Sequence, residues 1–350
     1  MSVIKVTSEH QYDVVIGKPW LSELITSLAD YSRVAIFFSE NQRKYIPEVS
    51  TPAEVHYFPL PDGEGAKSSQ TLLKMWNWMG AAGFTRSDVV IAVGGGTITD
   101  AAGFLSATWM RGIDWIAVPT TLAGMVDASV GGKTGINSEY GKNLIGAFHS
   151  PRKVIIDPEW LRTLPARDLA AGLAEVIKTG FISDASILDL MKEFHLDRDR
   201  ENLELLTQLI EKSVSVKAQV VSADFRESFE REILNYGHTL GHAIERHSRY
   251  TLRHGEAISI GLVFAAHLSS IHCSLSSDVV QQHIDLLSKI GLPTSYDREA
   301  FAQLHALMSI DKKSRGNSLR FVGLSEVGKT QRIEGLKMED IALVYEKIAK

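Results

Sequence analysis

The first half of the chain alternates short apolar runs with segments of helical spacing. The strand-like runs are residues 12–16, 34–38, 53–58, 89–93, 113–118 and 154–156. Several are apolar on both faces, and helical spacing occupies residues 21–29, 69–82 and 97–110 between them. Such alternation predicts strand-helix-strand units and a mostly parallel sheet covered by helices. Ligands in this architecture bind beyond the carboxyl ends of the strands.

From about residue 163 the sequence changes to long segments with helical spacing of apolar residues. They cover residues 166–181, 185–194, 202–223, 233–248, 256–271 and 277–290. Near the end, residues 319–324 and 330–333 predict a small hairpin, and residues 338–349 predict a closing helix. We therefore predict an α/β N-terminal domain over residues 1–160 and a mainly α-helical C-terminal domain over residues 161–350.

Composition narrows the class of protein. The chain has 350 residues and a formal net charge of -5, which gives no electrostatic reason to expect nucleic acid or an anionic membrane as partner. Its one cysteine, Cys273, excludes an intramolecular disulfide framework and a cysteine-rich zinc site. The N-terminus lacks the pattern of a signal peptide, and no apolar run approaches the roughly 20 residues that cross a bilayer. We expect a cytoplasmic protein.

A glycine-rich turn follows the apolar run at residues 89–93. The segment VVIAVGGGTITD ends a predicted strand in three glycines and opens into a predicted helix. Glycines at this position let the backbone approach a pyrophosphate, whose charge the first helical turn can receive. The GxGxxG fingerprint is not matched, and a simple tight strand-to-helix turn is the alternative interpretation. The upstream loop PDGEGAK adds a carboxylate and an ammonium group. Considered alone, this loop would be interpreted as a surface turn.

A second glycine-rich segment, DASVGGKTG at residues 127–135, contains the GKT of a nucleotide-triphosphate loop. That loop requires a glycine five residues before Gly132, where this chain has Asp127, so an ATPase is disfavoured. Lys133 can still bind a substrate phosphate or carboxylate. The next turn supplies a further cation and an amide in Lys142 and Asn143.

Among the histidines of the segment 231–256, three candidates for metal binding, His238, His242 and His254, lie within seventeen residues of one another. His238 and His242 are four apart, so on a helix both rings leave the same face, as a divalent metal would require. A metalloprotease motif is excluded because Thr239 stands where its general-base glutamate would be. A third ligand must come from elsewhere, and both His254 and Glu175 are candidates. The alternatives are packed histidines and, for Glu175, an intrahelical ion pair with Lys178.

Ten motifs in this order resemble the 3-dehydroquinate synthase family of the shikimate pathway. They are GGGTITDAAGF, WMRG, VPTTL, VDASVGGKTGIN, GKNLIGAF, LRTLP, GLAEVIKTG, REILNYGHTLGHAIE, HGEAISIG and DKK. The resemblance covers roughly residues 10–345. It implies a Rossmann-like NAD-binding domain, a helical metal- and substrate-binding domain, and a homodimeric, NAD-dependent lyase that requires zinc or cobalt. Its substrate would be an anionic sugar phosphate, 3-deoxy-D-arabino-heptulosonate 7-phosphate, converted into 3-dehydroquinate and phosphate.

The resemblance also implies a role for individual residues. The metal ligands would be Glu175, His238 and His254, which moves His242 to the substrate. The NAD site would comprise Glu64, Lys67, Gly95, Gly96, Thr97, Asp100, Thr120, Thr121, Asp127, Lys142 and Thr163, with Glu40 or Asn41 on the ribose. Substrate contacts would be Lys133, Asn143, Lys178, Lys217, Arg231, Asn235, His242 and Lys312, and Arg111 would come from the partner subunit.

Two other enzyme classes share parts of this pattern. An aminodehydroquinate synthase, or another sugar-phosphate cyclase, would carry the same GGKTG and histidine motifs. A polyol dehydrogenase of the iron-dependent type also opens with a glycine-rich turn, but an uncharged polyol needs no set of lysines.

Overall fold

The computed structural model describes residues 1–226, 230–314 and 319–350, without the side chains of residues 310–314. Two compact units are present. The first comprises Met1–Leu164 and Leu203–Arg226, and the second comprises Pro165–Asn202 and Glu227–Lys350. This grouping differs from a single division at residue 160, because the helix at Leu203–Ala223 belongs with the first unit.

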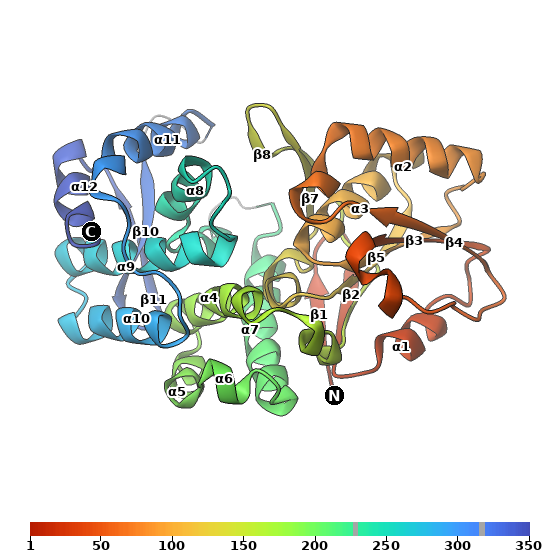
Figure 1. Ribbon diagram of the computed structural model, residues 1–350, viewed down its shortest axis with the longest axis horizontal. Coiled ribbons are helices and arrows are strands. Elements are labelled where there is room, and N and C mark those ends of the chain that lie inside the picture. Colours follow the sequence, from red (N-terminus) through yellow and green to blue (C-terminus); the bar gives the residue numbers. More distant parts are fainter. Residues whose placement is uncertain (227–229, 315–318) are drawn as a thin grey trace. The chain divides into compact units, whose positions relative to one another are not determined.

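The first unit is built on a seven-stranded sheet in the order β1-β2-β9-β6-β5-β3-β4 (Figure 1). Its strands are β1 (Ser2–Thr7), β2 (Gln11–Ile16), β3 (Arg33–Ser39), β4 (Glu54–Leu60), β5 (Val89–Gly94), β6 (Asp114–Pro119) and β9 (Lys153–Ile156). All neighbours are parallel except β1 and β2. The predicted parallel sheet is confirmed, and the inner strand β5 is buried along its whole length, as its unbroken apolar run requires.

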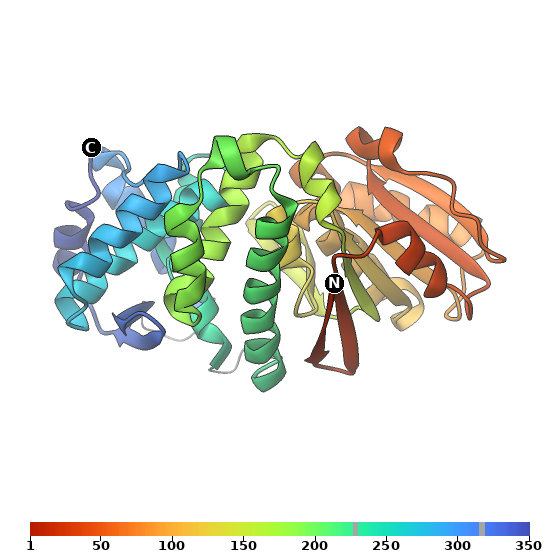
Figure 2. The ribbon, with the colours of Figure 1, turned by 90° about the horizontal axis from the view of Figure 1, so that it is seen from below.

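Four helices accompany this sheet: α1 (Trp20–Thr26), α2 (Ser69–Ala81), α3 (Gly96–Thr108) and α7 (Leu203–Ala223). Helix α3 packs on β5 and β6, whereas α7 runs along the edge strand β1, as seen from below in Figure 2. The pattern did not predict β1, nor the separate antiparallel hairpin of β7 (Lys133–Ser138) and β8 (Gly141–Phe148). Glycine and lysine dominate the start of that hairpin and conceal its alternation.

The second unit is mainly helical, as predicted. Its helices are α4 (Ala166–Ile182), α5 (Ala185–Glu193), α6 (Leu196–Asp199), α8 (His238–His247), α9 (His254–His272), α10 (Ser277–Lys289), α11 (Phe301–Ser314) and α12 (Met338–Tyr345). Helix α9 is apolar on nearly every side and is buried among α4, α8 and α10 (Figure 1). The predicted hairpin forms as β10 (Arg320–Glu326) and β11 (Lys329–Glu334). No helix in the described ranges combines the length and apolarity needed to span a bilayer.

One predicted helix begins later than its pattern indicates. Residues 233–248 have helical spacing, but Glu230–Asn235 forms a separate 3-10 turn and α8 begins at His238. The break lies at Gly237, whose φ of 78° is in the left-handed region. This turn places His238 at the first position of α8.

Candidate metal and dinucleotide sites

Glu175, His238 and His254 converge in the second unit from three different helices. Glu175 lies in the middle of α4, His238 begins α8 and His254 begins α9. One ligand atom from each lies within 4.8 Å of the other two. The Nε2 atoms of His254 and His238 are 2.9 Å and 3.4 Å from Glu175 Oε1. The structure thus brings together the three residues that the family resemblance implies as ligands.

Close backbone contacts between helices produce this convergence. A Cβ added to Gly255 would lie 1.8 Å from the carbonyl oxygen of Ala171, so α9 begins directly against α4. A Cβ on Gly261 would lie 2.0 Å from the carbonyl oxygen of Gly237, so α9 also touches the turn before α8. The missing Cβ atoms of Gly255 and Gly261 therefore set the spacing of α9 against α4 and against the turn before α8.

The electrostatics of the cluster keep the Glu175 carboxylate ionised. Burial raises its pKa, but the charge of Lys178 and the hydrogen bonds to His238 and His254 outweigh burial and hold the pKa well below the usual range. Lys178 Nζ lies 2.5 Å from Glu175 Oε2 and donates to the carbonyl oxygen of Leu234. Although Lys178 is this near, Glu175 Oε2 has no partner of hydrogen-bonding geometry.

His254 holds a proton strongly in the metal-free protein. Burial lowers its pKa, but the carboxylates of Glu245 and Glu175 outweigh burial and raise the pKa to about 10. A buried carboxylate and two imidazole nitrogens facing one point form a donor set that zinc and cobalt accept. The residues present therefore fit a divalent metal, which would displace that proton.

His242 lies beside this cluster and outside its ligand set. Its ring centroid is 5.2 Å from that of His238, with the planes at 89°. It groups instead with Glu245 and His254, and its side chain is exposed. His238 and His242 thus share a face of α8, but only His238 faces Glu175.

The other implied substrate residues of the second unit lie around the same segment. Arg231 and Asn235 occupy the 3-10 turn before α8, and Arg231 is buried. Because Lys178 donates to Leu234 in this turn, the cluster and the turn are joined. Lys312 lies outside the described side chains.

The glycine turn of the first unit lies where β5 meets α3. Gly95 caps the helix, and Gly96 and Thr97 form its first residues. A Cβ on Gly95 would lie 3.0 Å from Thr121 Cγ2, and one on Gly96 would lie 3.0 Å from the Cβ of Ala128. The helix N-terminus is thus held close to the segment after β6, and the free N–H groups of such an N-terminus can receive the charge of a phosphate.

A network of charged side chains lies beside this turn. Lys67 is buried and donates to both Asp100 of α3 and Asn143 of β8. Burial raises the pKa of Asp100, and Lys67 opposes that rise. Glu64 pairs with Lys142 at 2.6 Å and accepts from Asn137 at 2.6 Å. Asn137, which the sequence did not single out, therefore helps to join the loop after β4 to the β7-β8 hairpin.

The carboxyl end of β3 holds the two ribose candidates. Glu40 and Asn41 begin the 3-10 turn Glu40–Tyr45 and are both exposed. The next residue, Gln42, donates from Nε2 to Thr120 Oγ1 at 2.7 Å. No sequence signal identified Gln42, because the contact joins the ends of two strands far apart in the chain. Ser39 donates to Asp62 of the loop after β4.

The remaining implied residues of the first unit are more dispersed. Lys217 of α7 donates to both the backbone and the carboxylate of Asp127. Thr121 Oγ1 accepts from the backbone of Gly124, and Thr163 donates within its own turn to Trp160. Lys133 begins β7, and Arg111 lies in the turn Trp109–Arg111 after α3.

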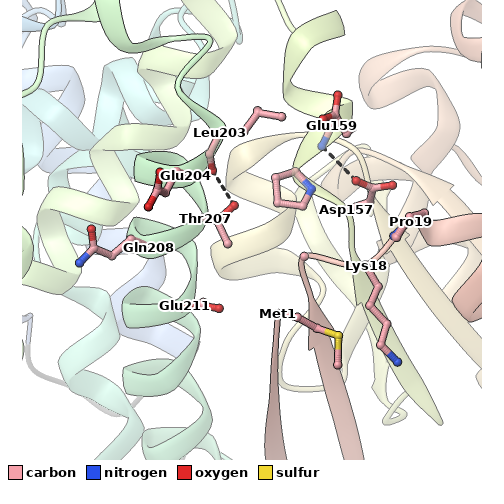
Figure 3. Close-up of a pocket in the computed structure, with 12 residues that line it drawn as sticks. Met1, Lys18, Pro19, Asp157, Glu159, Leu203, Glu204, Thr207, Gln208 and Glu211 are labelled. Atoms are coloured by element: carbon pink, nitrogen blue, oxygen red, sulfur yellow. Dashed lines mark hydrogen bonds between the residues drawn. The ribbon is translucent and has the colours of Figure 1, made fainter.

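A cavity of about 650 Å³ in the first unit lies apart from these residues. Figure 3 shows it between the start of α7, with Glu204 and Glu211, and the segments that hold Lys18 and Asp157. The carboxylate of Asp157 has a structural role, since it accepts hydrogen bonds from the backbone N–H groups of Trp20 and Glu159. No residue implied by the family resemblance lines this cavity.

Known proteins resemble the chain along its whole length. The model of the 3-dehydroquinate synthase N-terminal family matches residues 57–171, and that of the C-terminal family matches residues 172–314. The 3-dehydroquinate synthase of Rhodococcus opacus (strain B4) is 47% identical over 357 residues, covering 99% of this chain and 95% of the relative. That of Thermobifida fusca (strain YX) is 47% identical over 344 residues, covering 97% and 94%.

Solved structures of sugar-phosphate cyclases share the fold. A 2-epi-5-epi-valiolone synthase from Streptomyces hygroscopicus, with NAD+ and Zn2+ bound, has a TM-score of 0.89 at 25% identity and covers 99% of this chain and 98% of its own. A 2-deoxy-scyllo-inosose synthase, complexed with carbaglucose-6-phosphate, NAD+ and Co2+, has a TM-score of 0.85 at 26% identity and covers 99% and 100%. A probable glycerol dehydrogenase from Sinorhizobium meliloti, at 16% identity, shares the fold alone, with a TM-score of 0.69 and coverage of 96% and 95%. The chain belongs to the 3-dehydroquinate synthase family.

Proposed function

We propose that the protein converts 3-deoxy-D-arabino-heptulosonate 7-phosphate into 3-dehydroquinate and phosphate. The observation that carries this proposal is the convergence of Glu175, His238 and His254 within 4.8 Å, in a chain that both family models match. The relatives at 47% identity support this substrate over the amino analogue. A dehydrogenase acting on uncharged polyols shares only the fold.

NAD and one divalent ion, zinc or cobalt, are the proposed cofactors. Glu175, His238 and His254 would hold the metal, and the turn at Gly95 and Gly96 would receive the NAD phosphates. When bound, NAD exchanges a hydride with a substrate carbinol, and the metal acts as a Lewis acid at neighbouring hydroxyls. The side chains orient the substrate so that elimination of phosphate and ring closure proceed in one bound geometry.

The substrate carries a phosphate and a carboxylate, which require local cations in a chain of net negative charge. The proposed anion contacts are Lys133, Asn143, Lys178, Lys217, Arg231, Asn235 and Lys312. Charge-assisted hydrogen bonds from such groups fix an anion more strongly than neutral ones. His242, which is exposed beside the metal cluster, is the proposed group for moving protons.

A homodimer is the proposed assembly, with Arg111 of one protomer reaching the substrate of its partner. The segment around Arg111 supports this role. Met110 and Arg111 have φ values of 49° and 67°, so both occupy the left-handed region that non-glycine residues rarely adopt. Met110 is also 48% exposed.

The test is an assay of phosphate release from the purified protein. With heptulosonate phosphate and NAD we expect phosphate release without net accumulation of NADH, and arrest of turnover when a chelator removes the metal. The same assay with the amino analogue separates the two cyclase activities. Steady NADH formation with a polyol would replace the proposal with a dehydrogenase, and turnover that survives complete metal removal would overturn the metal assignment.

A further inference from the structure

Glu245 is a buried carboxylate at the metal cluster that has no part in the proposed ligand set. It lies on α8, is 5% exposed, and its Oε2 is 3.2 Å from Nδ1 of His254. The other nitrogen of the same ring, Nε2, is 2.9 Å from Glu175 Oε1. His254 is therefore placed between two carboxylates, one at each nitrogen.

His238 shows what such a contact does to a metal-binding histidine. Its Nδ1 is 3.0 Å from the carbonyl oxygen of Tyr236, and a carbonyl can only accept a hydrogen bond. Nδ1 of His238 therefore carries the proton, and the lone pair of Nε2 is directed at the cluster. At His254 the carboxylate of Glu245 takes the place of that carbonyl, because an ionised carboxylate also only accepts.

Helical spacing explains why α8 can supply this group. Glu245 is seven residues after His238 and three after His242, so all three side chains leave the same face of the helix. One helix face thus carries a proposed metal ligand, a proposed proton-transfer group and the carboxylate that orients His254. The sequence contains this spacing in HTLGHAIE, but a search for ligands by histidine position overlooks it.

A second metal bound by His242, Glu245 and His254 is the competing interpretation, since their ligand atoms also lie within 4.8 Å of one another. Both sites would then require His254, each through a different nitrogen. Its ring would have to lose both protons and become an imidazolate. A neutral ring that donates from Nδ1 and binds one metal through Nε2 requires no such deprotonation.

We propose that Glu245 is a positioning residue that holds His254 in the Nδ1-protonated form, with Nε2 aimed at the metal. This inference rests on the proposed ligand set of Glu175, His238 and His254. Partners of this kind orient the imidazole and increase its basicity, and their loss commonly weakens metal binding about 10–100-fold. Because the partner of His238 is a backbone carbonyl, Glu245 is the orienting group that a substitution can remove.

The test measures metal affinity without reference to turnover. Metal-free wild type, Glu245→Gln and Glu245→Asp are titrated with Zn2+ in competition with a chromophoric chelator, and the bound metal per chain is counted. We expect one metal per chain throughout, about 10–100-fold weaker binding by Glu245→Gln, and a smaller loss for Glu245→Asp. Co2+ absorption spectra should change in Glu245→Gln, because an uncharged amide accepts more weakly from Nδ1 and no longer increases the basicity of the ring.

Asp199→Asn is the matched control. Asp199 is a buried carboxylate of the same unit, 5% exposed, that accepts from Arg198 and from the backbone of His195. Its loss should affect stability without changing Zn2+ affinity. Unchanged affinity in Glu245→Gln, or two metals per wild-type chain with one lost in that variant, would overturn the inference.

Two further measurements keep the outcomes distinct. Wild-type protein with 15N-labelled histidine and bound Zn2+ should show His254 protonated at Nδ1, and protonation at Nε2 would contradict the inference even if Glu245→Gln failed to fold. Glu175→Ala tests the ligand set itself. Full Zn2+ affinity in Glu175→Ala would refute that set, whereas a loss there with normal affinity in Glu245→Gln would refute only the role of Glu245.

Discussion

The metal cluster of the second unit and the charged network of the first unit neutralise their charges differently. At the cluster, Glu175 faces two histidine nitrogens, and a proton held by His254 occupies the place of a cation. In the network, Lys67 is already paired with Asp100, and Lys142 with Glu64. On the proposed assignment of the two sites, a metal would displace one proton, whereas a dinucleotide would meet ion pairs that are already formed. We therefore expect the metal cluster to be the more fully organised of the two before its ligand binds.

The largest expected effect comes from removing one metal ligand. His254→Ala should lose the metal and lower kcat by about 1000-fold or more, because a Lewis acid contributes several kcal/mol to such a reaction. His242→Ala should retain one metal per chain and turn over slowly, since His242 lies outside the ligand set. Metal analysis and single-turnover kinetics measure both. If His242→Ala lost the metal and His254→Ala kept it, the ligand set would instead include the pair His238 and His242.

The next effect compares a glycine from each region. Gly255→Ala should cost about 3 kcal/mol or more of unfolding free energy, because its Cβ would meet the Ala171 carbonyl oxygen at 1.8 Å and α9 would have to move away from α4. The Cβ of Gly95→Ala would meet the side chain of Thr121, with its methyl group nearest at 3.0 Å, so we expect a loss below about 1 kcal/mol together with weaker NAD binding.

Denaturant unfolding of the metal-free proteins measures the loss of unfolding free energy in both glycine variants, and NAD titration measures the weaker NAD binding of Gly95→Ala. Equal destabilisation of Gly255→Ala and Gly95→Ala would show that the two glycine-rich regions do not differ in packing.

These regions also differ in how well the sequence predicted them. The buried runs of β3 and β5 were predictable because each is a short, unbroken apolar segment, and α4 and α9 because their apolar segments are longer than a strand. The hairpin of β7 and β8 was not, since glycines interrupt its alternation. The start of α8 was also missed, because helical spacing continues through Gly237 although the backbone reverses there. Local periodicity cannot report a left-handed residue or a contact between helices.

Site residues follow the same division. The family resemblance named Glu175, His238 and His254, whereas spacing alone favoured His238 with His242. Spacing could not choose, because Glu175 and His254 come from other helices and meet only after α4 and α9 pack. Gln42 lies in none of the quoted motifs, and Glu245 ends the motif REILNYGHTLGHAIE without an assigned role there. Both were recognised only from their contacts with Thr120 and His254.

An intermediate effect is expected from removing the cation of the buried ion pair between Lys67 and Asp100 in the first unit. Lys67→Met should cost about 1–3 kcal/mol of unfolding free energy at neutral pH, because Asp100 loses its cation while remaining largely buried. Burial already raises the pKa of Asp100, and loss of Lys67 should raise it further. A carboxyl whose folded pKa exceeds its unfolded pKa binds more protons in the folded state, so the penalty should grow as pH rises from about 4 to 7.

Chemical unfolding at several pH values checks this dependence, with Lys67→Met/Asp100→Asn as the control. In the double variant the charge is absent and the pH dependence should disappear. The Zn2+ affinity of both variants should equal that of wild type, because Lys67 has no part in the metal cluster. A penalty independent of pH would attribute the loss to packing of the lysine stem.

The smallest effect is expected at the exposed ion pair of the same network. The side chains of Lys142 and Glu64 are 25% and 40% exposed, and water screens such a pair strongly. Glu64→Gln should therefore change unfolding free energy by less than about 1 kcal/mol, and the change should shrink as salt is added. The amide can still accept from Asn137, which isolates the charge as the altered quantity. Unfolding at low and high ionic strength measures this, and a salt-independent loss above about 1 kcal/mol would mean that the network of the first unit is organised in advance as tightly as the metal cluster.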